Sequence, residues 1–161
     1  MRKIDSLRAT LLAAIPEANN DPAMLPTWID RGSVRGRQTG SGSFEMAFRL
    51  NVLAIGVRTD LSLISLAVTK WLRANQPERL QPGSDSFTFD ADILDNDTAD
   101  VLIQIDLTQN YEVTTVNGEE RVEPVEQTDP VLEEANAEGL APDIAAILLA
   151  GVVVEQRIAH A

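Results

Sequence analysis

The feature that most constrains the fold is a regular alternation of apolar and polar side chains from Phe44 to Val52. Every second residue is large and apolar, and the residues between them are Glu, Ala, Arg and Asn. A period of two indicates a β-strand with one buried face, because successive side chains point to opposite sides of a sheet. The chain must therefore build a sheet and cover one face of it. From Leu53 to Val57 the alternation is lost, which predicts that this end is covered on both faces.

Two amphipathic helices are predicted, over residues 3–15 and 61–74. In each of them apolar residues recur with the helical period and form a single stripe. Pro16 ends the first helix, Asp60 caps the second, and Gln76-Pro77 ends it. The stripes consist of Ile4, Leu7, Leu11 and Ile15 in the first helix and of Leu61, Ile64, Val68, Trp71 and Leu72 in the second.

Further strands are predicted on both sides of the second helix. Residues 28–37 are predicted to form a short hairpin that turns at Arg31-Gly32. Residues 87–94 and 101–107 are predicted strands joined by an Asp-Asn-Asp turn, and Asn117-Gly118 predicts a type I′ hairpin. Because hairpins link the strands, the expected fold is α+β, with two layers: a mainly antiparallel sheet covered by two helices.

The chain divides by composition into three parts. Residues 1–123 are the predicted α+β domain, 124–142 an acidic linker with three prolines, and 143–161 an apolar C-terminal arm. The arm fits a helix throughout or a helix followed by a strand. It can dock on a neighbouring subunit or fold back on its own domain, and both alternatives stay open. The candidate contact residues in the arm are Ile144, Leu148 and Val153.

Charge is distributed very unevenly along the chain. Residues 1–84 carry 11 basic and 7 acidic side chains, a net charge of +4, whereas residues 85–161 carry 2 basic and 18 acidic, a net charge of −16. Nucleic acid is bound through Lys and Arg, so this balance argues against the whole chain as a DNA-binding protein. The uneven charge fits better a subunit that presents opposite charges to different neighbours.

No pattern of catalytic, cofactor-binding or metal-binding residues stands out. The chain has no cysteine, and its one histidine is His160, beside the C-terminus. The glycine-rich run 40–43 precedes a strand rather than a helix, so it lacks the helix N-terminus that binds phosphate. The aspartates between Asp90 and Asp100 do not match a calcium-binding loop. We expect no enzyme activity, no cofactor and no metal.

Neither a secretory signal nor a membrane span is expected from the sequence. The first residues lack an apolar signal region. No stretch reaches the roughly 20 apolar residues that a membrane span requires.

Two groups of polar residues are candidate contacts with partners. Arg31, Arg35 and Arg37 border the glycine-rich run, where they can hold an acidic partner surface, line a DNA channel, or simply be solvated. The loop that begins at Gln76 and Glu78 is a second candidate. No aromatic residues are interleaved with the arginines, which weakens an interpretation as a single-strand binding site.

Four motifs in fixed order resemble one known family. They are residues 7–17, 43–45, 71–78 (Trp-Leu-Arg-Ala-Asn-Gln-Pro-Glu) and 87–96 (Phe-Thr-Phe-Asp-Ala-Asp-Ile-Leu-Asp-Asn). Together they resemble the tail completion protein R family of temperate, contractile-tailed phages, which has a tail terminator-like fold. The resemblance covers residues 5–116 and does not extend to the C-terminal arm.

The resemblance implies a structural protein at the head-proximal end of a phage tail, in the virion, assembled in the host cytoplasm. Tail terminators form hexameric rings that stop tube growth, so the implied partners are further copies of the chain, tube and sheath proteins, and head–tail connector proteins. DNA contact is then possible only through the ring lumen, and no membrane is involved. A DNA-contacting binding module that uses the Arg31, Arg35 and Arg37 segment is the alternative. An infectious phage, a prophage and a phage-tail-like bacteriocin are all possible sources.

Overall fold

The structure is a computed structural model that describes residues 1–38 and 40–126. The predicted arm with Ile144, Leu148 and Val153, and all but the start of the predicted linker, lie outside these residues. In chain order the elements are α1 (Arg2–Ala14), α2 (Pro16–Asn20), the 3-10 turn η1 (Pro22–Met24), β1 (Thr27–Gly36), β2 (Phe44–Val57), α3 (Leu61–Asn75), the 3-10 turn η2 (Pro77–Leu80), β3 (Thr88–Ile93), β4 (Ala99–Val116) and β5 (Glu119–Val125).

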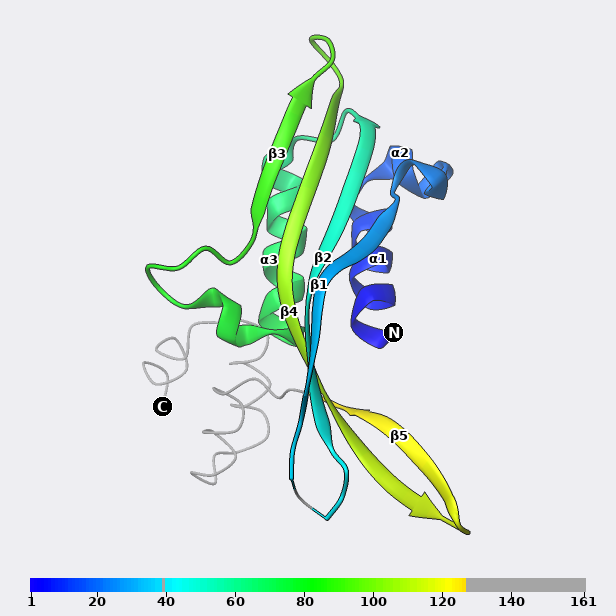
Figure 1. Cartoon of the computed structure of the whole chain (residues 1–161). Coiled ribbons are helices and arrows are strands. Elements are labelled where there is room, and N and C mark those ends of the chain that lie inside the picture. The colour runs from blue at the N-terminus through cyan, green and yellow to red at the C-terminus, as the bar shows by residue number, and fades with distance from the viewer. Residues whose placement is uncertain (39, 127–161) are drawn as a thin grey trace, which may run out of the picture. The chain divides into compact units, whose positions relative to one another are not determined.

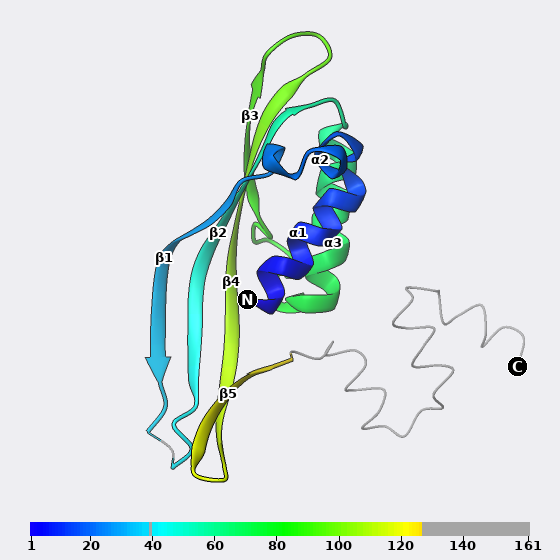
Figure 2. The same ribbon diagram turned by 90° about the vertical axis from the view of Figure 1, so that its right-hand side faces the viewer.

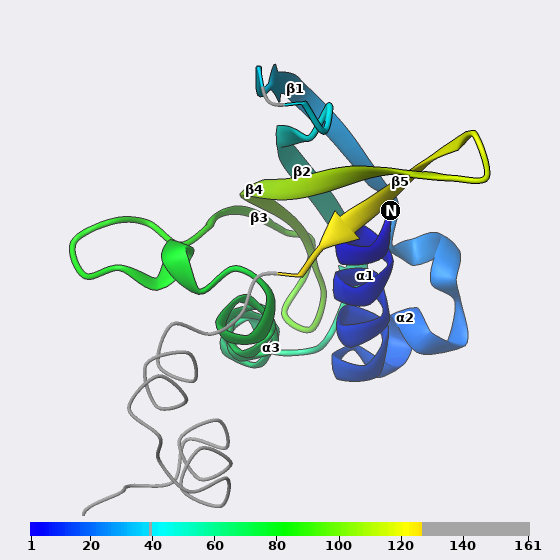
Figure 3. The same cartoon turned by 90° about the horizontal axis from the view of Figure 1, so that it is seen from below.

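The described residues form a five-stranded antiparallel sheet with helices on one face. The strand order is β1-β2-β4-β3, and β5 pairs with β4 beyond the end of β3. Both long helices lie against the same face of the sheet (Figures 1 and 2). Seen from below, α3 lies on the side of β3 and α1 on the side of β1 (Figure 3). The predicted two-layer α+β architecture is therefore confirmed.

The helix boundaries follow from their capping residues. Asp60 accepts a hydrogen bond from the Ser62 backbone N–H at 2.7 Å, which satisfies a free donor at the start of α3. Asp21 does the same for Ala23 at 3.2 Å and opens η1. Pro16 ends α1, but the chain then forms α2 with this proline at its first position, where no N–H is needed. The short helix α2 was not predicted.

The core lies between the helices and one face of β2 and β4. The predicted stripes point inward, and the Trp71 indole N–H also donates to the Ser6 hydroxyl of α1 at 3.0 Å. The fully or almost fully buried apolar residues are Leu7, Leu11 and Ile15 of the first helix and its end, Ala18 of α2, Leu25 before β1, Phe48, Leu50, Val52, Ala54 and Val57 of β2, Ile64, Val68, Trp71 and Leu72 of α3, and Val101, Ile103, Ile105 and Leu107 of β4.

The predicted hairpin over residues 28–37 is wrong. This segment is the single strand β1, which pairs with β2 along its whole length. The register shifts between Asp30 and Ser33, so Arg31 and Gly32 form a β-bulge rather than a turn. A glycine flanked by strand residues is compatible with both structures, and only the pairing partner decides between them.

The expectation that the end of β2 is covered on both faces is also wrong. Leu53 is half-buried and Ile55 is 38% exposed, because the helices cover only one face of the sheet. Conversely, the predicted strand at 101–107 continues without interruption to Val116 as β4. The type I′ turn is confirmed, since Asn117 and Gly118 both have positive φ, at 53° and 80°.

The strands are much longer than the helices that cover them. A helix rises about 1.5 Å per residue and a strand about 3.3 Å, so the 15 residues of α3 span about 22 Å and the 18 residues of β4 about 59 Å. The helices therefore cannot cover the whole sheet. The β1–β2 hairpin and the β4–β5 hairpin extend past the N-terminal end of α1 (Figures 1 and 2).

Replacement of a residue under the helices should lower the free energy of unfolding far more than replacement of a residue on their outer side. We expect Leu50→Ala to lower the free energy of unfolding by about 2–5 kcal/mol, because it leaves a cavity in the sheet–helix core. The matched control is Leu63→Ala on α3, where the side chain is 56% exposed and the loss should stay within about 0.5 kcal/mol. Urea unfolding measures both, and equal losses would contradict this placement of the core.

Candidate assembly interface

The bulge in β1 gives Arg31 an unusual backbone conformation. Its φ is 51°, in the left-handed region that residues other than glycine rarely adopt. Asp30 pairs with Arg49 and Ser33 with Ala47, so two residues of β1 stand opposite the one residue between those partners on β2. Such conformations cost free energy and concentrate at functional sites. The bulge changes the direction of the Arg31 side chain relative to its neighbours.

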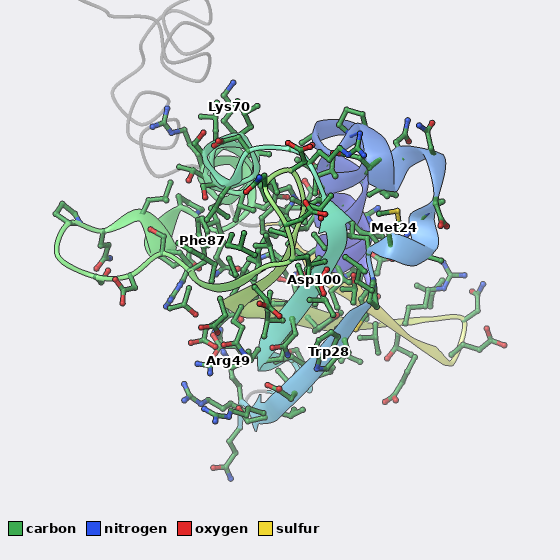
Figure 4. All side chains as sticks on the ribbon, turned by 90° about the horizontal axis from the view of Figure 1, so that it is seen from above. Met24, Trp28, Arg49, Lys70, Phe87 and Asp100 are labelled. Atoms are coloured by element: carbon green, nitrogen blue, oxygen red, sulfur yellow. The ribbon has the colours of Figure 1, made fainter. Side chains whose placement is uncertain are left out.

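Arg49 and Asp106 form an ion pair on the face of the sheet opposite the helices. They are directly paired residues of β2 and β4, and the guanidinium donates to both carboxylate oxygens, at 2.8 and 3.1 Å. Figure 4 shows Arg49 and Trp28 on this open face and Lys70 on the far side of α3. The two-point geometry fixes both side chains more firmly than a single contact would.

Three guanidinium groups act on the Asp106 carboxylate. The hydrogen bond from Arg49 lowers its pKa most, and the positive charges of Arg49, Arg79 and Arg31 lower it further. Asp106 is therefore ionised throughout the neutral range and cannot neutralise all three. Neither Arg31 nor Arg79 forms an ion pair with any carboxylate of residues 1–38 and 40–126.

A cavity of about 310 Å³ opens beside this ion pair. Arg79 lines it and donates from one end of its guanidinium to the Asp85 carbonyl at 3.1 Å. The Nε of the same group is buried and has no hydrogen-bond partner among the described residues. The polar residues that line the cavity are Arg31, Arg49, Gln76, Glu78, Arg79 and Asp106.

Gln76 forms part of the fold as well as of the cavity wall. On the edge of β4 that faces away from β2, β3 pairs as far as Gln104 and β5 begins to pair at Asn110. The stretch between them has no strand on this edge. Gln76 fills this gap: its side-chain oxygen accepts from the Thr108 N–H at 3.4 Å, and its amide donates to the Thr108 hydroxyl at 2.8 Å. Glu78 accepts from the same amide.

Lys3 completes the closure of this edge. Its ammonium donates to the Thr108 carbonyl at 2.8 Å and to the Gln76 side-chain oxygen at 2.7 Å, and the side chain is only 8% exposed. The two side chains thus satisfy both backbone groups of Thr108, as a neighbouring strand would. This contact ties the first turn of α1 and the end of α3 to β4.

The structure brings some of the predicted contact residues together and separates others. Arg31 lines the same cavity as Gln76 and Glu78, although 45 positions or more separate them in the chain. Arg35 lies further along β1 and pairs with Glu45 at 3.6 Å. Arg37 follows the end of β1 and lies near Phe44 and Asn110 instead. All three arginines are exposed.

Sequence reasoning missed Lys3, Arg49, Arg79 and Asp106. The alternation in β2 indicates that Arg49 lies on the polar face of the strand. Its partner Asp106 is 57 positions away, and the pairing depends on strand register, which the sequence does not show. For Lys3, one charged residue at the start of a helix carries no sign that it is buried.

The described part of the chain has neither a metal-binding cluster nor a membrane-spanning helix. Within residues 1–38 and 40–126, no group of three or more acidic, His or Cys side chains could hold a metal ion. The helices of the same residues are too short or too polar to cross a membrane.

Asp95 is a turn residue as predicted, since its carboxylate accepts from the N–H groups of Asp97 and Thr98, both at 2.8 Å.

Residues 1–130 match the family described as P2 phage tail completion protein R (GpR). The tail completion protein R of Escherichia phage P2 is 34% identical over 133 residues, which are 81% of this chain and 86% of the relative. The chain belongs to the P2 phage tail completion protein R family. No solved structure matches it.

In this member of the tail completion protein R family, the motifs behind the resemblance have identifiable structural roles. Trp71 is in the core and bonded to α1, and Gln76 closes the edge of β4. Asp95 forms the turn between β3 and β4. The family consists of structural proteins of phage tail completion and virion assembly, which confirms the assignment made from sequence.

The buried Lys3 should make stability depend on pH. Burial lowers its pKa from 10.5 to about 8, and the negative charge of Glu78 opposes part of that shift. Between these values the unfolded chain binds more protons than the folded protein, so the free energy of unfolding should rise with pH from about 8 to 10.5. Below about 8 both states are protonated, and the contribution is constant.

The Lys3→Met variant isolates this effect. Urea unfolding at several pH values across the window should show the rise in the natural chain and a flatter profile in the variant. Parallel profiles would show that Lys3 is not the group responsible.

Proposed function

We propose that this chain is a tail completion subunit that forms a homo-oligomeric ring, a hexamer, at the head-proximal end of a contractile phage tail. The ring stops growth of the tube and sheath and provides the surface for head joining. Its partners are further copies of the chain, tube and sheath proteins, and head–tail connector proteins. It assembles in the host cytoplasm, remains in the virion tail, and carries out no catalysis.

The observation that carries this proposal is the relationship to the tail completion protein R of phage P2. The family match extends over residues 1–130 and so includes both helices and the whole sheet. A relationship of that extent favours a common fold and a common place in assembly, rather than one shared motif. The absence of cysteine agrees with a structural role.

The architecture supports an assembly role. The described residues expose an uncovered sheet face and two hairpins that extend past the helices, and these surfaces are available to neighbours (Figure 1). Many of their exposed side chains are charged, as at the polar rims of protein interfaces. Within this proposal, Arg31, Arg35, Arg37 and Glu78 contact partners. Gln76 was also a candidate, but it is only 1% exposed and its side chain is bonded to Thr108, so it holds the fold instead.

Loss of the protein should change tail length and head attachment. In a phage or prophage whose gene for this chain is deleted, electron microscopy should show tails of irregular length without heads. A plasmid copy of the natural gene should restore tails of uniform length with heads attached. Deletion that leaves normal particles would overturn the proposal.

The C-terminal arm should be needed for assembly but not for folding. All the core residues found in the described part of the chain lie between Leu7 and Leu107, so a chain ending at Pro130 should keep its free energy of unfolding within about 1 kcal/mol. We propose that Ile144, Leu148 and Val153 dock on a neighbour, so this truncated chain should fold yet fail to complement the deletion. Loss of cooperative unfolding would instead place the arm in its own core.

A further inference from the structure

The β4–β5 hairpin is strongly acidic and exposed. Residues 111–126 contain five glutamates and one arginine, a net charge of −4. Among residues 1–38 and 40–126, only Glu126 of these five forms an ion pair, with Arg2 at 3.3 Å. The other four carboxylates are exposed and face solvent: Glu112, Glu119, Glu120 and Glu123.

Two of these glutamates are placed directly opposite each other. Glu112 of β4 pairs with Glu123 of β5 in the hairpin register, so both side chains lie on the same face. Like charges in directly opposed positions destabilise a β-hairpin. Glu119 and Glu120 follow at the tip, so four exposed carboxylates lie along this one hairpin and suit it to a positively charged surface.

The basic surface that could receive it lies elsewhere on the molecule. We define the arginine surface as Arg31, Arg35, Arg49 and Arg79, with the cavity beside Asp106. Asp106 is already bonded to Arg49, and Arg35 lies beside Glu45. Arg31 therefore remains for an incoming carboxylate, and so does the part of the Arg79 guanidinium that does not donate to the Asp85 carbonyl, in a cavity wall that also holds Glu78. Guanidinium groups suit a carboxylate as planar two-point donors.

A hairpin cannot reach the arginine surface of its own chain. The tip follows Val116, ten positions along β4 from Asp106, which at about 3.3 Å per residue is roughly 33 Å away. The base of the hairpin is held by the Phe44 ring, which stacks on Tyr111 with ring centroids 5.2 Å apart. Contact between the two surfaces therefore requires two molecules.

We propose that the acidic β4–β5 hairpin of one copy binds the arginine surface of the next copy, with Glu119 and Glu120 at the tip facing Arg31 and Arg79. This inference rests on the proposed ring function and names the surfaces that meet within it. Each copy carries one surface of each kind, and they lie on different parts of the molecule. Such a head-to-tail contact repeats from copy to copy and closes into a ring when the rotation between copies allows it.

The natural chain has no cysteine, which makes disulfide or bismaleimide crosslinking a clean test. Full-length Arg31→Cys and Glu120→Cys variants are mixed at low salt and treated with a short bismaleimide, and the same pair is co-expressed in cells that assemble tails. The matched control replaces Glu120→Cys by Asp97→Cys, an exposed acid at the tip of the other β4 hairpin. Non-reducing gel electrophoresis and mass spectrometry measure the amount of crosslinked heterodimer.

We expect about tenfold more heterodimer from the Arg31–Glu120 pair than from the control, and less of it as salt screens the charges. Charge reversal by Glu119→Arg with Glu120→Arg should reduce self-association, and mixing with an Arg31→Glu copy should restore it. Crosslinking no greater than the control in both settings would overturn the inference. So would salt-dependent binding of duplex DNA by the arginine surface with no effect of the hairpin variants.

The inference and the proposed function fail in distinguishable ways. If gene deletion disturbs tails while the hairpin variants complement fully and give no specific crosslink, the ring uses other surfaces and the function stands. If deletion leaves tails normal, the function itself fails, whatever the crosslinking shows.

Discussion

The ladder between β2 and β4 is the interaction on which the rest of the described structure depends. These strands pair from Phe44 and Tyr111 to Val57 and Ala99, and each of the other strands is attached to one of them. One side of the ladder holds the core, and the other carries Arg49 and Asp106. Because strands rise about twice as far per residue as helices, the two helices cover only part of this ladder. The uncovered remainder forms the two extended hairpins.

The same ladder leaves one edge that strands do not complete, between β3 and β5. A buried carbonyl or N–H without a partner is costly, and here Lys3 and Gln76 provide the partners for Thr108. Burial of an ammonium group is itself unfavourable, which is why its pKa falls. Gln76 therefore ends α3 and, together with Lys3, also attaches both helices to the sheet.

The apolar core and the residues proposed as contacts occupy different parts of the described structure. The apolar residues under the helices hold the domain together, whereas Arg49, Asp106 and the hairpin glutamates lie on the open face and on the β4–β5 hairpin. Charges in such positions contribute little to folding but can select and orient a partner. Part of the net charge of −16 over residues 85–161 is therefore concentrated on one projecting hairpin, β4–β5.

The sequence by itself determined the elements whose signals are local. The helical stripes, the Asp60 cap, the alternation in β2 and the Asn117-Gly118 turn all depend on residues close together in the chain, and the structure has them all. The family was also accessible, because its motifs are continuous stretches. Tertiary structure decided the rest: the bulge in place of a turn at Arg31, the pairing of Arg49 with Asp106, and the burial of Lys3 against Gln76. These join positions 57 and 73 residues apart, or depend on which strand lies alongside, and no local pattern specifies a strand's register or neighbour.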